Sequence, residues 1–246
     1  MINDLKLSLC TRFKDRLLHI TQTLPTWVRI PEIDEIVITD YNSQKDNIIS
    51  LLKKINDKRV TLLKVPGVMG FDRGRCHNIG IGHAQGNLIL NIDADILLSP
   101  SILRTIRPDN SLNFYVSSID NRKKGYYGSC IFFKEMWKKV NGYVEGFNTW
   151  GCEDINFYAR LKHAGYKQVP IITPDMMNHI SHDDKLRFQH HEFKRKDPSK
   201  IHAVLHSYST VMQPTNYSEI SYPYDEPLND WPDNFRRFPE IGKIPL

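Results

Sequence analysis

Short apolar runs alternate with amphipathic stretches over the first part of the chain. A short apolar or alternating run is typical of a strand, whereas apolar residues three and four positions apart are typical of one helix face. Pro25 is expected to end the first helix. The patterns predict strands at 5–10, 35–39, 60–65 and 88–92, and helices at 11–23, 48–55 and 75–85. This alternation favours a parallel sheet covered by helices on both faces.

The pattern is less regular beyond Pro108. We expect strands at 113–117, 128–133, 168–172 and 176–179, and helices at 134–140 and 153–163. Residues 183–200 are polar and charged, and residues 203–246 are rich in proline and aromatic residues. The sequence therefore predicts one domain over residues 1–202 and an irregular C-terminal tail, 203–246, packed on it.

Composition adds few constraints. The chain has 246 residues, 40% of them hydrophobic and 25% charged, which is ordinary for one soluble domain. Its net charge of +5 permits an anionic ligand, but no basic run is dense enough to predict nucleic acid as a partner. Its four cysteines, at 10, 76, 130 and 152, form no C-x-x-C pair, so neither a zinc site nor a disulfide framework is expected. Without an apolar run of about 18 residues or a signal peptide, we expect a cytoplasmic protein.

The most informative stretch is the apolar strand at 88–92, which ends in an Asp-x-Asp sequence at Asp93 and Asp95. Side chains two residues apart point to one side of an extended chain, and two adjacent buried carboxylates are costly unless a cation lies beside them. A solvated strand end is the alternative. Asp40 and Arg73 lie at or after the ends of other predicted strands. Because open sheets of this kind bind ligands beyond the carboxyl ends of their strands, these four residues predict one ligand-binding rim.

Three segments, in this order, resemble the glycosyltransferases of the GT-A fold. They resemble in particular the beta-1,4-galactosyltransferases and related bacterial capsule polymerases and N-acetylgalactosaminyltransferases. The segments are FDRGRCHNIGIGHAQGNLILNIDADILL at 71–98, Trp150-Gly151-Cys152-Glu153-Asp154 preceded by Val140-Asn141-Gly142-Tyr143, and Met176-Met177-Asn178-His179. The resemblance implies a single-domain, Rossmann-like α/β fold with a mixed, mainly parallel sheet flanked by helices.

On the donor side, the resemblance implies four residues that contact a nucleotide sugar. Asp40 would accept the uracil N–H, and Arg73 would contact the nucleotide, although Asp72 stands where the family has asparagine. Asp93 would contact the ribose or the water shell of a metal, and Asp95 would bind the metal directly. An ordinary turn is the alternative for Asp40, and a surface salt bridge is the alternative for Arg73.

The metal would be held by Asp95 and by His179 of the family's M-x-x-H motif. His182 is a rival for His179, and Met176 would add a thioether contact unless it is a core residue. Carboxylate and imidazole together suit Mn²⁺, with Mg²⁺ as the alternative.

On the acceptor side, Trp150 would offer a flat face to a sugar ring, and Gly151 would allow close approach. Glu153 would orient the acceptor, and Asp154 would be the catalytic base, with an ordinary pKa near 4 and kept ionised by the helix start. A core tryptophan and a simple preference for acidic residues at a helix start are the alternatives.

The resemblance as a whole implies a metal-dependent, inverting transfer of a hexose from a UDP-sugar to a saccharide hydroxyl. Galactose or N-acetylgalactosamine would be the sugar, and a lipid-linked acceptor of bacterial capsule or lipopolysaccharide assembly would receive it. Basic residues within 183–200 suggest peripheral association with an anionic membrane, with a solvated segment as the alternative. A sugar-nucleotide nucleotidyltransferase and a non-catalytic sugar-binding module remain alternative functions.

Overall fold

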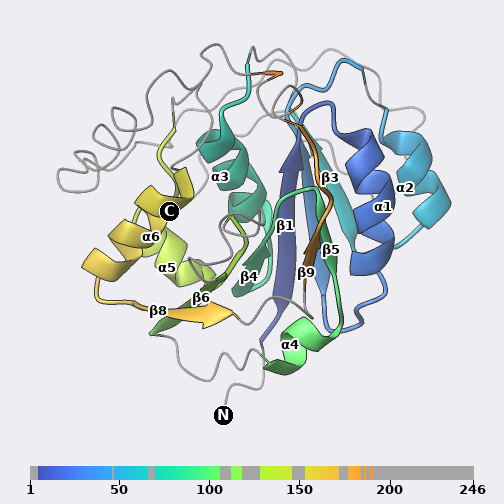
Figure 1. Ribbon diagram of the computed structural model, residues 1–246. Coiled ribbons are helices and arrows are strands. Elements are labelled where there is room, and N and C mark those ends of the chain that lie inside the picture. Colours follow the sequence, from blue (N-terminus) through green and yellow to red (C-terminus); the bar gives the residue numbers. More distant parts are fainter. Residues whose placement is uncertain are drawn as a thin grey trace.

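The computed structural model describes residues 5–45, 47–65, 70–105, 112–117, 128–145, 153–171, 177–183, 186 and 189–190 (Figure 1). The strands are β1 (Leu7–Phe13), β2 (Glu35–Asp40), β3 (Val60–Lys64), β4 (Leu88–Asn91), β5 (Ile96–Leu98), β6 (Asn113–Ser117), β7 (Cys130–Phe133), β8 (Lys167–Ile171) and β9 (Met177–His179). The helices are α1 (Leu17–Trp27), α2 (Ile49–Ile55), α3 (Arg73–His83), α4 (Ser101–Thr105), α5 (Lys134–Lys139) and α6 (Glu153–His163).

Seven strands form one mixed sheet in the order β3-β2-β1-β4-β7-β6-β8. The pairs β1–β2, β1–β4, β2–β3 and β6–β8 are parallel, whereas β4–β7 and β6–β7 are antiparallel. The sequence-based prediction of a mainly parallel sheet flanked by helices is therefore confirmed. The carboxyl ends of β1, β2 and β4 meet at one edge, which is where the candidate residues lie.

The sheet separates two hydrophobic cores. Figure 1 shows α1 and α2 on one face of the sheet and α3, α5 and α6 on the other. Side chains of β1 alternate between these cores: Leu7 and Leu9 pack on the α1 side, and Cys10 packs on the α3 side. Burial on both faces explains why the first strands read as continuous apolar runs.

A separate antiparallel pair, β5 with β9, lies on the α1 side. Ile96 pairs with His179, and the N–H of Ile180 donates to the carbonyl of Asp95 at 2.8 Å. The indole of Trp27 donates to the carbonyl of Ile96 at 2.9 Å. This pairing brings the end of the described chain beside the Asp-x-Asp sequence.

Several element boundaries lie one or two residues from their predicted positions, whereas those of β1 and α1 differ by more. β1 runs on to Phe13, so residues 11–13 are strand and not helix, because Arg12 and Phe13 pair with Thr39 and Asp40 of β2. α1 continues past Pro25 to Trp27. Packing of the buried Trp27 against β5 outweighs the local stop signal of the proline.

Other outcomes concern short elements and residues outside the described part of the chain. β5 and α4 were not predicted, since runs of three and five residues carry little periodicity. Residues 203–246, the predicted tail, lie outside the described residues. No helix in the described part of the chain is long and apolar enough to cross a bilayer.

Candidate active site

The site lies at the carboxyl ends of β1, β2 and β4, next to the start of α3. Asp72 caps this helix: its side chain accepts a hydrogen bond from the N–H of Arg75 at 3.0 Å. The aspartate that replaces the family's asparagine therefore still serves to begin the helix, and Arg73 occupies its first position.

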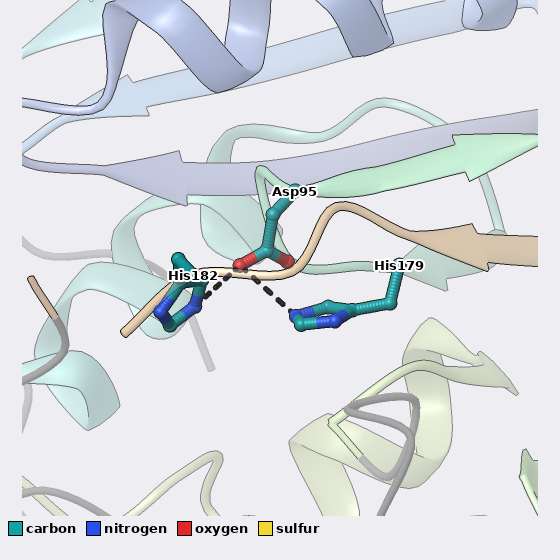
Figure 2. Close-up of side chains that lie close together, drawn as sticks. All are labelled: Asp95, His179 and His182. Atoms are coloured by element: carbon teal, nitrogen blue, oxygen red, sulfur yellow. Dashed lines mark hydrogen bonds and ion pairs between the residues drawn. The ribbon is translucent and has the colours of Figure 1, made fainter. Parts of the chain in front are cut away.

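Asp95, His179 and His182 form a compact cluster. Figure 2 shows both imidazole rings directed at one carboxylate. The distance to Asp95 Oδ2 is 3.1 Å from His182 Nε2 and 3.5 Å from His179 Nε2. One ligand atom from each of the three residues lies within 4.8 Å of the other two. Asp95 and His179 thus come together as predicted, and the rival His182 joins them instead of replacing His179.

The charge state of Asp95 suits a cation. Burial by itself would raise the pKa of Asp95, but hydrogen bonds and charge from His179 and His182 more than reverse this, so its pKa lies well below the usual range. Its Oδ1 is buried without a hydrogen-bond partner among the described residues. An unsatisfied carboxylate oxygen beside two imidazoles is the donor set expected of a transition-metal site. Met176, the candidate thioether ligand, lies outside the described residues.

Two arginines hold Asp93. The Arg12 side chain, 2% exposed, donates from Nη2 to Asp93 Oδ1 at 2.6 Å and from Nη1 to the carbonyl of Ile92 at 3.2 Å. Arg73 Nη2 approaches the same Asp93 oxygen at 3.4 Å, and Arg73 Nε contacts Glu153 Oε1. Burial would lower the pKa of Arg73, but the charges of Glu153 and Asp93 raise it, so the guanidinium stays charged. Arg73 therefore joins the predicted donor side to the predicted acceptor side.

Asp154, the candidate base, lies in the first turn of α6. A Cβ built on Gly128 would lie 3.2 Å from Asp154 Oδ2 and 2.7 Å from Asp93 Oδ2. The two carboxylates thus both face Gly128, where a larger residue would require at least the Asp93 carboxylate to shift. Burial, followed by the charge of Glu153, raises the pKa of Asp154 to about 8 although Arg73 opposes this. The expected ordinary pKa is therefore wrong: burial outweighs the favourable effect of the helix start.

Of the remaining predicted site residues, only Asp40 lies in the described part of the chain. Asp40 is 2% exposed and accepts a hydrogen bond from the N–H of Ser43 at 2.9 Å, the arrangement of an aspartate that orders its own turn. Burial raises the pKa of Asp40. Its contact with a nucleotide base stays a prediction. Trp150 and Gly151 lie outside the described residues.

Two buried residues of the site are not predicted by the sequence pattern. Arg12 lies in a segment, 11–23, whose pattern predicts a helix, whereas it belongs to β1. His77 lies with its Nε2 3.9 Å from Asp154 Oδ1. Its position four residues after Arg73, one helical turn, was the available signal.

Two family models match adjoining parts of the chain. A family model described as glycosyltransferase-like family 2 matches residues 9–114, and one described as the N-terminal domain of galactosyltransferase matches residues 111–205. The chain is a glycosyltransferase of the GT-A type. The first model begins within β1 and includes the Asp-x-Asp sequence, and the second includes Asp154 and both histidines of the cluster.

Solved structures share the fold of this glycosyltransferase at low sequence identity. A Drosophila β1,4-galactosyltransferase 7 variant in complex with manganese, UDP-Gal and xylobiose is 18% identical, with a TM-score of 0.54 over 80% of this chain and 79% of that chain. A Pyrobaculum calidifontis mannosyltransferase in complex with GDP-Man and Mn²⁺ is 15% identical, with a TM-score of 0.61 over 86% and 71%. S. aureus TarS 1–349 in complex with UDP-GlcNAc is 13% identical, with a TM-score of 0.58 over 72% and 59%. No curated protein matches the chain.

Proposed function

We propose that this glycosyltransferase transfers a hexose from a UDP-sugar to a saccharide hydroxyl, with inversion at the anomeric carbon. The observation that carries the proposal is the pair of carboxylates, Asp93 and Asp154, that face Gly128 next to the first residue of α3. One carboxylate follows the donor-side strand and the other starts the acceptor-side helix. A nucleotide sugar and an acceptor that meet at this point would bring the reacting atoms together.

The cluster of Asp95, His179 and His182 would hold Mn²⁺. The buried, unpaired Oδ1 of Asp95 and the two convergent imidazoles fit this ion better than Mg²⁺, which prefers oxygen ligands and water. When bound, Mn²⁺ supplies positive charge that stabilises the departing nucleoside diphosphate. The galactosyltransferase 7 and mannosyltransferase structures both contain manganese with a nucleotide sugar.

Asp154 would act as the general base. Its deprotonated Oδ2 takes the proton of the acceptor hydroxyl while the hydroxyl oxygen bonds to the anomeric carbon and the bond to UDP breaks. A raised pKa makes the carboxylate a stronger base than an ordinary aspartate, which suits a weakly acidic hydroxyl. Arg12 and Arg73 keep Asp93 in place and neutralise the surrounding carboxylates. A single displacement of this kind inverts the anomeric configuration.

The proposals for the donor sugar and for the biological setting are based on similarity to known glycosyltransferases. UDP-Gal is the first donor to test because the galactosyltransferase model spans the acceptor side, and UDP-GalNAc is the second. The resemblance to bacterial capsule and lipopolysaccharide enzymes supports a lipid-linked saccharide acceptor at the inner face of the cytoplasmic membrane. Most of the basic stretch 183–200, which would approach that membrane, lies outside the described residues.

The decisive experiment measures transfer. UDP release is followed with a panel of UDP-sugars, Mn²⁺ and candidate saccharides, and the anomeric configuration of the product is read by NMR. Transfer from UDP-Gal or UDP-GalNAc that requires Mn²⁺ and disappears in Asp95→Ala supports the proposal. Release of pyrophosphate from UTP and a sugar 1-phosphate would indicate a nucleotidyltransferase instead. Donor binding without turnover across a broad acceptor panel would favour a sugar-binding module.

A further inference from the structure

His77 is a buried histidine in the site for which the proposed reaction has no role. Its side chain is fully buried, and its ring stacks on Tyr143 with centroids 4.0 Å apart and planes 4° from parallel. Asn78 in turn fixes Tyr143, since it accepts from the Tyr143 N–H and donates to the Tyr143 carbonyl, both at 2.8 Å. The orientation of the imidazole ring is therefore set by its surroundings.

Two atoms without partners face each other across a short gap. His77 Nε2 and Asp154 Oδ1 lie 3.9 Å apart, and both are buried without a hydrogen-bond partner among the described residues. The distance exceeds a hydrogen bond, which is about 3 Å, so a hydrogen bond between them requires the carboxyl group to move towards the ring. A buried polar atom without a partner is costly, so two such atoms side by side indicate a hydrogen bond with one proton between them.

Asn91 shows which of the two atoms is the donor. Its side-chain N–H group donates to the Tyr143 hydroxyl at 3.3 Å, and its Oδ1 lies 3.0 Å from His77 Nδ1. An oxygen at this position requires the proton on Nδ1. In a neutral ring, Nε2 then carries a lone pair that points at Asp154, so the proton of the shared hydrogen bond belongs to the carboxyl group.

We propose that His77 is a positioning residue for Asp154, whose protonated carboxyl group donates a hydrogen bond to His77 Nε2. The inference rests on the proposed role of Asp154 as the base. In the resting enzyme the carboxyl proton lies on Oδ1, and its loss to solvent gives the carboxylate that accepts the proton of the sugar hydroxyl through Oδ2. After transfer, the carboxyl group returns its new proton to solvent. His77 thus raises the pH above which the enzyme is active, in addition to the larger effects of burial and Glu153 on Asp154.

The surrounding charges agree with this arrangement. Burial, followed by the charges of Arg12 and Arg73, lowers the pKa of His77 well below 6.5, which keeps the ring neutral. The groups that face His77 are Asp154, Arg12, Arg73 and Asn91. Those that face Asp154 are His77, Glu153, Arg73, Arg12, Asp93, Cys130, Tyr143 and Tyr158. With a pKa of about 8, Asp154 is protonated at neutral pH and can donate.

The tautomer of His77 can be read directly. Two-bond ¹H–¹⁵N spectra of the ¹⁵N-histidine-labelled protein, assigned with His77→Phe, distinguish the two neutral tautomers and the charged ring. We expect a neutral ring with the proton on Nδ1 at pH 7. A proton on Nε2, or a charged ring, overturns the proposal, because Nε2 would then donate to Asp154. This measurement needs no activity, so it is independent of whether the right donor sugar has been found.

The second test removes the acceptor atom. His77→Phe keeps a ring to stack on Tyr143 but has no nitrogen, so the protonated form of Asp154 loses its partner. We expect the titration of the Asp154 side-chain ¹³C signal, and the acidic limb of the pH–rate profile, to move down by about 1 pH unit. The control is His83→Phe, which changes another histidine of α3 and should leave both unchanged. An unmoved or upward-shifted Asp154 titration contradicts the proposal. If the Asp154 titration shifts but no transferase activity is found, the proposed function is contradicted while the His77–Asp154 hydrogen bond is still supported.

Discussion

Arg12 Nη2 donates to Asp93 Oδ1 at 2.6 Å, so a residue of the first strand fixes the first carboxylate of the Asp-x-Asp sequence. The strands that carry them, β1 and β4, are neighbours in the sheet and run parallel. The position of Asp93 is therefore determined by the same register that builds the sheet. A change at Arg12 should affect both stability and turnover.

Arg12→Met removes the charge and retains most of the volume. Asp93 and the carbonyl of Ile92 then lose a donor, which should cost about 1–3 kcal/mol in the free energy of unfolding. Turnover should fall about 10–100-fold, as when a group that orients metal-site residues is lost. Urea unfolding and initial rates measure the two effects. Arg59→Met is the control: Arg59 bonds three backbone carbonyls and Asp57, so its loss should lower stability with no change in turnover per folded molecule.

The metal assignment predicts that His182 is as important as His179. Alanine at Asp95, His179 or His182 should each weaken Mn²⁺ binding in the presence of UDP by at least about 10-fold. Isothermal titration with Mn²⁺ measures this directly. His190→Ala is the matched control, because His190 pairs with Asp15 and not with Asp95. Unchanged Mn²⁺ affinity in His182→Ala would remove His182 from the ligand set and return the site to Asp95 and His179.

The sequence predicted most of the fold because each strand of the parallel half is buried on both faces. Burial of this kind leaves continuous apolar runs such as 35–39 and 88–92 that local patterns can identify. Where pairing between distant segments decided the structure, local patterns failed. Residues 11–13 became strand because β2 provides their partners, and β5 exists because β9 pairs with it.

The candidate site was predictable where chemistry follows the strand ends or a motif. Asp93, Asp95 and His179 belong to this group. Arg12 and His77 could not be identified, because a buried arginine or histidine becomes significant only through the carboxylate that it faces. The pKa of Asp154 was mispredicted for a related reason. The helix start favours its charge locally, but burial and the neighbouring Glu153, which arise from tertiary packing, have the larger effect.

Asp154→Asn tests the base without removing its volume. Turnover should fall about 10²–10⁴-fold, the usual range for loss of a general base. UDP affinity in the presence of Mn²⁺ should stay within about twofold, because the nucleotide is held on the Asp95 side. Initial rates and titration calorimetry provide the two measurements. Near-normal turnover, or a loss of UDP affinity in place of turnover, would exclude Asp154 as the base, and Glu153→Gln would be the next variant to examine.

The raised pKa of Asp154 also predicts how stability depends on pH. The carboxyl group has a pKa of about 8 in the folded protein, against 3.8 for an ordinary aspartate, so the folded state retains a proton that the unfolded state has lost between these values. This group's contribution to stability is complete below about pH 4 and is lost as the pH rises towards 8. Asparagine at this position carries no charge at any pH, so a protein with asparagine here does not lose this stability as the pH rises. Asp154→Asn should therefore be more stable than the wild type by about 1–2 kcal/mol at pH 9 in metal-free buffer, with a smaller difference at pH 5. Thermal unfolding of the two proteins at both pH values measures this difference, and a gap that stays constant with pH would show that Asp154 titrates like an ordinary aspartate.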